Sequence, residues 1–93
     1  MPERASITFL TRGGCTLCDV ARADLQALLE ERARAGRTPA LVREVDIAAD
    51  PALERRDLDR IPVLVVGDEE LPLATSVRAM RAFLERTLDG RLA

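Results

Sequence analysis

The feature of this sequence with the clearest chemical meaning is a pair of cysteines, Cys15 and Cys18, separated by Thr16 and Leu17. Residues three apart on a helix have Cβ atoms about 5–6 Å apart, whereas a disulfide needs about 3.5–4.5 Å. The two thiols can therefore close into a disulfide and reopen with modest adjustment. Such a pair suits either thiol–disulfide exchange or the binding of a soft metal ion.

The position of the pair favours a reactive thiolate at Cys15. A run of β-branched and aromatic residues predicts a strand over residues 6–11, and a helix is expected to begin at about Cys15. The first helical turn has unpaired N–H groups and the positive end of the helix dipole, and Arg12 adds a positive charge nearby. Asp19 disfavours a thiolate most strongly at Cys18. We therefore assign Cys15 as the attacking thiol and the more deeply placed Cys18 as the resolving thiol.

The composition excludes several other kinds of chemistry. The chain has no histidine and no lysine, so it has no Cys–His or Ser–His pair, no imidazole zinc ligand and no lysine Schiff base. Its net charge is −2 and it has no basic block, which argues against a nucleic-acid partner. We find neither a signal peptide nor an apolar run of the ~20 residues that a membrane span needs. A cytoplasmic protein is expected, and there a close cysteine pair is more often catalytic or metal-binding than structural.

The predicted elements form a single domain over residues 1–93 with the order βαβαββα. Strands are predicted over 6–11, 40–47, 62–66 and 70–73, and helices over 15–35, 51–58 and from a cap at Thr75 or Ser76 to Gly90. The long helix makes the first two strands parallel, and the tight turn at Gly67 makes the last two antiparallel. These rules predict an α/β protein with a four-stranded mixed sheet, with two helices on one face and one on the other.

Apolar residues at three- and four-residue steps predict the buried faces of two helices. In the first helix these residues are Leu17, Val20, Ala21, Leu25, Leu28 and Leu29, and in the last they are Val77, Met80, Phe83, Leu84 and Leu88. The charged residues of 40–47 and Pro72 in 70–73 indicate edge strands, because edges tolerate both.

A second feature is the Ile61–Pro62 step that opens the apolar strand over 62–66. A proline there cannot donate a hydrogen bond to the sheet. Judged from the residues alone, a trans bond is expected, because only ~5–6% of X–Pro bonds in folded proteins are cis.

Taken together, these features resemble the thioredoxin/glutaredoxin superfamily over nearly the whole chain, from Ser6 to Leu88. The sequence is most similar to a family of short bacterial glutaredoxin-like proteins of poorly assigned function. The residues that carry this resemblance are Leu10–Asp19 (LTRGGCTLCD), Val45–Ile47, Asp50–Pro51 and Ile61–Leu64 (IPVL). The resemblance implies a thioredoxin fold and the activity of an enzyme, a thiol–disulfide oxidoreductase.

The resemblance also implies roles for five further residues. Pro62 would be cis and pack against the cysteine pair, and Ile61 would offer its backbone N–H and C=O to a bound thiol. Arg12 stands where glutaredoxins often have a lysine that meets a glutathione carboxylate, and Thr75 and Ser76 stand where polar groups hold the other end of glutathione. Glutathione or another low-molecular-weight thiol would be a co-substrate, with no metal or organic cofactor bound. A disulfide-containing protein or small thiol as substrate, an external reductant and a monomer are expected.

The sequence departs from the glutaredoxin pattern at two places near the site. Thr16-Leu17 replaces Pro-Tyr or Gly-Pro between the cysteines, and Leu71-Pro72-Leu73 replaces Gly-Gly before the last helix. A protein disulfide or another small thiol therefore stays open beside glutathione as the substrate.

Two alternatives to an enzyme also stay open. A single C-x-x-C supplies two thiolates, so it can bind Cu(I), or Zn with ligands from a second copy or another molecule. A non-catalytic thioredoxin-fold adaptor is the other alternative.

Overall fold

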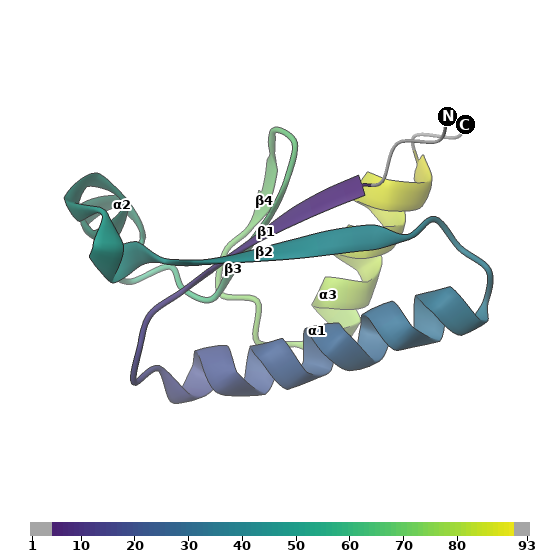
Figure 1. Ribbon diagram of the computed structural model, residues 1–93, viewed down its shortest axis with the longest axis horizontal. Coiled ribbons are helices and arrows are strands. Elements are labelled where there is room, and N and C mark those ends of the chain that lie inside the picture. The colour runs from purple at the N-terminus through teal and green to yellow at the C-terminus, as the bar shows by residue number, and fades with distance from the viewer. Residues whose placement is uncertain (1–4, 91–93) are drawn as a thin grey trace.

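The computed structural model describes residues 5–90. The elements are β1 (Ala5–Thr11), α1 (Thr16–Arg34), β2 (Ala40–Asp46), a short 3₁₀ helix (Ile47–Ala49), α2 (Pro51–Asp57), β3 (Val63–Val66), β4 (Glu69–Leu71), α3 (Val77–Leu84) and a π-helical segment (Glu85–Asp89). The sheet order is β2-β1-β3-β4, with β1 parallel to β2 and β3 antiparallel to both β1 and β4. This is the predicted mixed α/β sheet, and its arrangement is that of a thioredoxin-like fold (Figure 1).

The larger part of the core lies between the sheet and the two helices α1 and α3, which lie on the same side of it (Figure 1). Because side chains alternate along a strand, Ile7 and Phe9 of β1 point to this face together with Leu64 and Val66 of β3. The helices contribute Ala21, Leu25, Leu28, Met80, Phe83 and Leu84, all of which are buried. Burial of each large apolar side chain stabilises the fold by roughly 1.5–3 kcal/mol.

A smaller apolar cluster covers the opposite face of the sheet. It contains Leu10 of β1, Val63 of β3 and Ile47 of the 3₁₀ helix, with Leu53 of α2 and Ile61 packed against them. The helix α2 therefore lies on the face away from α1 and α3, as predicted. Within residues 5–90, no helix is both long enough and apolar enough to cross a membrane.

The buried stripe of α1 is narrower than predicted. Its buried residues are Cys18, Ala21, Leu25, Leu28 and Arg32, which follow strict steps of three and four. Leu17 and Val20 were predicted to be buried, but their exposed fractions are 55% and 53%. Each precedes a buried residue by one position, so a helical turn of about 100° carries it away from the sheet.

Arg32 takes a core position because Asp89, far along the chain, neutralises it. The guanidinium donates from Nη1 and Nη2 to the two carboxylate oxygens of Asp89, each at 2.9 Å, and Nη2 also donates to the carbonyl of Thr38 at 3.3 Å. Arg37 donates to the same carboxylate at 2.9 Å. These hydrogen bonds tie the end of α1 to the π-helical segment, and Arg32 is the main reason why the pKa of Asp89 lies below its ordinary value.

Two strands, β2 and β4, end earlier than predicted, for local reasons. The strand β2 ends at Asp46 because the Asp46 side chain accepts from the N–H of Ala48 at 2.8 Å and so starts the 3₁₀ helix. The strand β4 ends at Leu71, so Pro72 follows the edge strand instead of lying within it. The last helix changes from α to π geometry after Leu84 instead of continuing unchanged to Gly90.

Candidate functional site

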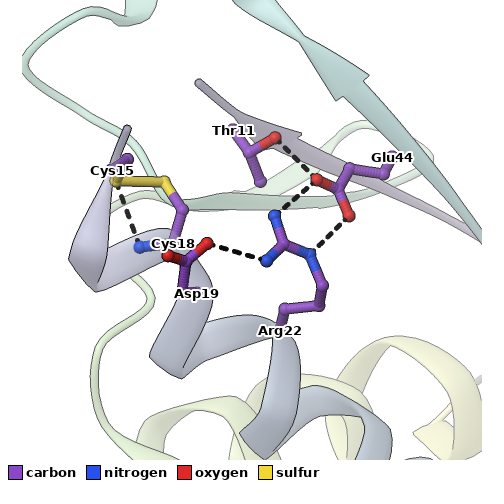
Figure 2. Close-up of a disulfide and its surroundings, with 6 residues drawn as sticks. All are labelled: Thr11, Cys15, Cys18, Asp19, Arg22 and Glu44. Carbon is purple, nitrogen blue, oxygen red and sulfur yellow. Dashed lines mark hydrogen bonds and ion pairs between the residues drawn. A yellow bond between two sulfur atoms is a disulfide. The ribbon is translucent and has the colours of Figure 1, made fainter. Parts of the chain in front are cut away.

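The two cysteines form a disulfide at the start of α1 (Figure 2). Their Cα atoms are 5.2 Å apart. Cys15 is the N-cap of the helix, and its Sγ accepts from the backbone N–H of Cys18 at 3.1 Å. Cys18 is fully buried whereas Cys15 is partly exposed, which is the difference in burial that the sequence predicts. A substrate can therefore reach Cys15 more easily than Cys18.

The loop before Cys15 is held by its neighbours on both sides. Gly14 has a positive φ of 79°, which lets the chain turn from β1 into α1. The N–H of Cys15 donates to the carbonyl of Arg12 at 3.2 Å. The guanidinium of Arg12 lies 3.3 Å from a carboxylate oxygen of Glu54 on α2. Arg12, which was expected to meet a glutathione carboxylate, is thus paired with a carboxylate of the protein itself.

A polar network next to Cys18 links α1 to the first two strands, and Figure 2 shows its members. Arg22 donates from Nε and Nη2 to the two carboxylate oxygens of Glu44, at 2.8 and 2.7 Å, and from Nη1 to Asp19 at 2.9 Å. The hydroxyl of Thr11 donates to Glu44 at 3.0 Å. The hydrogen bonds from Arg22 are the main reason why the pKa of Glu44 lies below its ordinary value, since burial alone would raise it.

This network was not predicted from the sequence. The signal that could have found it is the alternation of β2. Glu44 is opposite Phe9 in the parallel register, so its side chain points to the face covered by α1. Arg22 lies one turn after Cys18 on α1, and its guanidinium reaches the carboxylate of Glu44.

The Ile61–Pro62 step lies at the same end of the sheet as the cysteine loop. Because Leu10 is opposite Val63, the end of β1 that leads to Cys15 lies beside the start of β3. The Ile61–Pro62 peptide bond is cis, and Pro62 is buried. This placement brings the two sequence features together.

The backbone N–H of Ile61 differs from expectation. It was expected to be offered to a bound thiol, but it donates to the carbonyl of Asp57 at 3.1 Å. The reason is that α2 ends at Asp57, and the following turn closes by satisfying one of its last carbonyl groups.

The side chains around this turn form a second ionic network. Asp57 is fully buried and accepts from Arg60 at 2.7 Å. Arg60 and Arg56 both donate to Glu70 of β4, and these two hydrogen bonds hold the pKa of Glu70 below its ordinary value, with that from Arg60 the larger cause. The network joins α2 to β4 across the residues that precede Pro62. This network was not predicted either, because nothing in the sequence near Arg56 or Glu70 indicates that α2 and β4 are neighbours.

Thr75 and Ser76 follow Leu73 and Ala74, whose N–H groups donate to the turn formed by residues 60–62, here called the proline turn. The carbonyl of Pro62 accepts from the N–H of Ala74 at 2.8 Å. Ser76 caps α3, since its Oγ accepts from the N–H of Ala79 at 3.2 Å, and Thr75 donates from Oγ1 to the carbonyl of Leu73 at 3.4 Å. Both hydroxyl groups are therefore engaged locally.

A metal site would need ligands beyond this pair. Within residues 5–90, no group of three or more Cys, Asp or Glu side chains is placed to hold a metal ion. Cys15 and Cys18 therefore supply two thiolates at most.

A family model described as a glutaredoxin-like domain (DUF836) matches residues 6–90. The chain belongs to this glutaredoxin-like family. No curated protein matches it.

Solved structures that resemble this glutaredoxin-like protein include the following two. The X-ray structure of a Northeast Structural Genomics target protein from X. campestris is 34% identical, with a TM-score of 0.65, and the match covers 85% of this chain and 95% of that one. A structure described as that of a malarial protein is 12% identical, with a TM-score of 0.66, and the match covers 92% of this chain and 99% of that one. The second likeness concerns the fold alone.

Proposed function

We propose that this glutaredoxin-like protein is a cytoplasmic thiol–disulfide oxidoreductase that uses Cys15 as nucleophile and Cys18 as resolving thiol. The observation that carries the proposal is the pair itself. The two cysteines lie at disulfide distance at the N-terminus of α1, with only Cys15 partly exposed. The family membership is consistent with this chemistry.

The proposed reaction begins with the reduced protein. The Cys15 thiolate attacks one sulfur of a substrate disulfide, whose S–S bond breaks, and the departing thiolate takes up a proton. Cys18 then loses its proton and attacks the Cys15 sulfur, which releases the second substrate thiol. The two cysteines supply both electrons and end as the Cys15–Cys18 disulfide. An external thiol reductant, such as glutathione or another low-molecular-weight thiol, reduces this disulfide again.

The groups around the pair support separate roles for the two thiols. Cys15 is the N-cap of α1, where the positive end of the helix dipole favours its thiolate, and the N–H of Cys18 donates to its Sγ. Pro62 is buried at the neighbouring strand end, beside the end of β1 that leads to Cys15. Disulfide-containing proteins and mixed disulfides of small thiols are the proposed substrates, and a monomer is the proposed active form.

The test is a matched pair of variants, Cys15→Ser and Cys18→Ser, compared with the wild type. The reduced wild-type protein should reduce a model mixed disulfide, Cys15→Ser should have no activity, and Cys18→Ser should accumulate a mixed disulfide detectable by mass spectrometry. In a glutathione redox series, the wild-type pair should titrate between about −200 and −270 mV. Full activity in Cys15→Ser would refute the assignment. Thiols that resist alkylation until a chelator is added would support a metal-binding module instead.

A further inference from the structure

Leu73, between β4 and α3, has a backbone conformation that is rare for a leucine. Its φ is +51°, and among residues 5–90 no other residue except glycine has a positive φ. The left-handed conformation crowds the Cβ of an L-residue, so glycine usually occupies such positions. Leu73 is also the most exposed large apolar side chain of the described residues, with 57% of its surface accessible. A strained backbone and an exposed apolar side chain therefore coincide at one residue.

Backbone hydrogen bonds hold Leu73 in this conformation beside the proline turn. Its N–H donates to the carbonyl of Arg60, and the N–H of Ala74 donates to the carbonyl of Pro62, both at 2.8 Å. The carbonyl of Leu73 accepts from the N–H of Thr75, also at 2.8 Å. Strained residues persist where their surroundings fix them, and they are concentrated at ligand-binding sites. These three hydrogen bonds therefore offset the strain and fix the backbone of Leu73, whose side chain stays exposed beside Arg60 and Pro62.

The cysteine pair lies at the same end of the sheet as this turn. The register places the end of β1, which leads to Cys15, beside the start of β3, and Leu73 donates a hydrogen bond to Arg60, three residues before that start. After β4 the chain turns from the sheet towards α1 before α3 begins (Figure 1). Leu17, between the two cysteines, has an exposed fraction of 55%. Two exposed leucines therefore border the end of the sheet that carries the disulfide.

Two arginines near the pair, Arg12 and Arg22, are already matched by carboxylates of the protein. Arg12 lies 3.3 Å from Glu54, and Arg22 lies 2.9 Å from Asp19 and 2.7 Å from Glu44. A ligand such as glutathione has two carboxylates and depends on cations that are free to receive them. An uncharged apolar polypeptide has no such need, and its side chains can pack on exposed leucines.

We propose that Leu73 is a specificity-determining residue. It selects polypeptide disulfides whose cysteines are flanked by apolar side chains, which pack on Leu73 and Leu17 while Cys15 attacks the disulfide. This proposal rests on the proposed function and adds the substrate class to it. The reaction is the one already described, with both electrons supplied by the two cysteines.

The test uses the full chain, pre-reduced and in excess over substrate, so that each disulfide is reduced once without an added reductant. The substrates are two peptide disulfides of equal length and charge, one with leucines and one with serines next to the cysteines, and oxidised glutathione. The wild type should reduce the leucine peptide about five- to tenfold faster than the serine peptide at low concentration, because the exposed part of Leu73 becomes buried in the complex.

Three variants connect this preference to Leu73. Leu73→Asn, which tolerates a positive φ, should lose the preference, whereas Leu73→Met, which stays apolar, should keep it within about twofold. Leu41→Asn is the matched control, because Leu41 is 54% exposed but lies opposite Ser6, at the other end of β1 from the cysteine loop. It should keep the full preference.

The outcomes separate this proposal from the function on which it rests. A wild type that reduces both peptides and oxidised glutathione at equal rates overturns the role of Leu73 and leaves the proposed function in place. The role of Leu73 is overturned in the same way if Leu73→Asn keeps the preference or if Leu41→Asn loses it equally. Failure of the pre-reduced wild type to reduce any of the three disulfides overturns both.

Discussion

Replacing Asp89 by alanine is the sharpest test of how the C-terminal end of α1 is held to the π-helical segment. In Asp89→Ala the guanidinium of Arg32, a residue that is only 7% exposed, loses its bidentate partner and keeps one hydrogen bond, at 3.3 Å, to the carbonyl of Thr38. The Nε of Arg32 is buried and has no partner even in the intact pair. The variant therefore leaves a cation without a counter-charge in the core.

The size of the effect follows from burial. Removing one partner of a buried ion pair costs about 3–5 kcal/mol. The Asp89 side chain is 22% exposed, so water reaches part of the vacated space, and we expect a loss of about 3 kcal/mol in the free energy of unfolding. For a domain of this size such a loss lowers the melting temperature by about 12–24 °C. Urea unfolding followed by far-UV circular dichroism measures it, since the chain has no tryptophan or tyrosine to report by fluorescence.

Two controls decide whether the reasoning is right. Arg37 also donates to Asp89 but is 51% exposed, so Arg37→Ala should cost less than about 1 kcal/mol. The double variant Asp89→Ala/Arg32→Met removes both charges and should recover most of the loss. If Asp89→Ala cost no more than Arg37→Ala, or if the double variant recovered nothing, the pair would not be the buried support described here.

The same pair predicts a dependence on pH. Hydrogen bonds from Arg32 lower the pKa of Asp89 in the folded protein below its value of about 3.9 in the unfolded chain. A group whose pKa is lowered on folding contributes stability that is fully present above the unfolded pKa and is lost as the pH falls through the folded pKa. The stability difference between the wild type and Asp89→Ala should therefore be constant near neutral pH and shrink below about pH 4.

Two further predictions concern the cysteine end of the fold. Gly14→Ala should lower the free energy of unfolding, measured in urea, by about 1–2 kcal/mol because the φ of Gly14 is +79°, although a Cβ there meets nothing within 4 Å. Gly13 has no positive φ, so Gly13→Ala should lower it clearly less. Equal losses in the two variants would contradict the strain argument. Arg22→Gln should lower the free energy of unfolding by less than about 1 kcal/mol, since the Arg22 and Glu44 side chains are 43% and 39% exposed. In the same variant the pKa of Glu44, measured by NMR titration of its carboxyl carbon, should rise towards its ordinary value, and an unchanged pKa would show that Arg22 is not its cause.

The strands and their directions could be predicted because their signals are local. The β-branched run before the cysteines and the apolar run after Pro62 each identify a strand, and the long helix between the first two strands makes them parallel. The cysteine pair and the proline could be identified in the same way. Their meeting at one end of the sheet then follows from the topology.

Pairings between distant residues could not be predicted in this way. Arg32 and Asp89 are 57 positions apart, and nothing in either neighbourhood selects the other as its partner. The exposure of Leu17 was not predicted because two adjacent rows of apolar side chains on α1 fit the same helical period. Only the packing of α1 against the sheet decides which of the two rows is buried. Arg12 was read as free for a substrate because the approach of Glu54 depends on where α2 packs.

The disulfide between Cys15 and Cys18 closes a loop with a sequence separation of only three residues. A cross-link restricts the unfolded chain according to the length of the loop it closes, so this one removes little conformational entropy from the unfolded state. On the chain-entropy model it is worth roughly 2 kcal/mol, compared with nearly 5 kcal/mol for a bond that spans about 100 residues. Opening the bond therefore leaves most of the folding free energy in the sheet and its helices, and both oxidation states can share one fold.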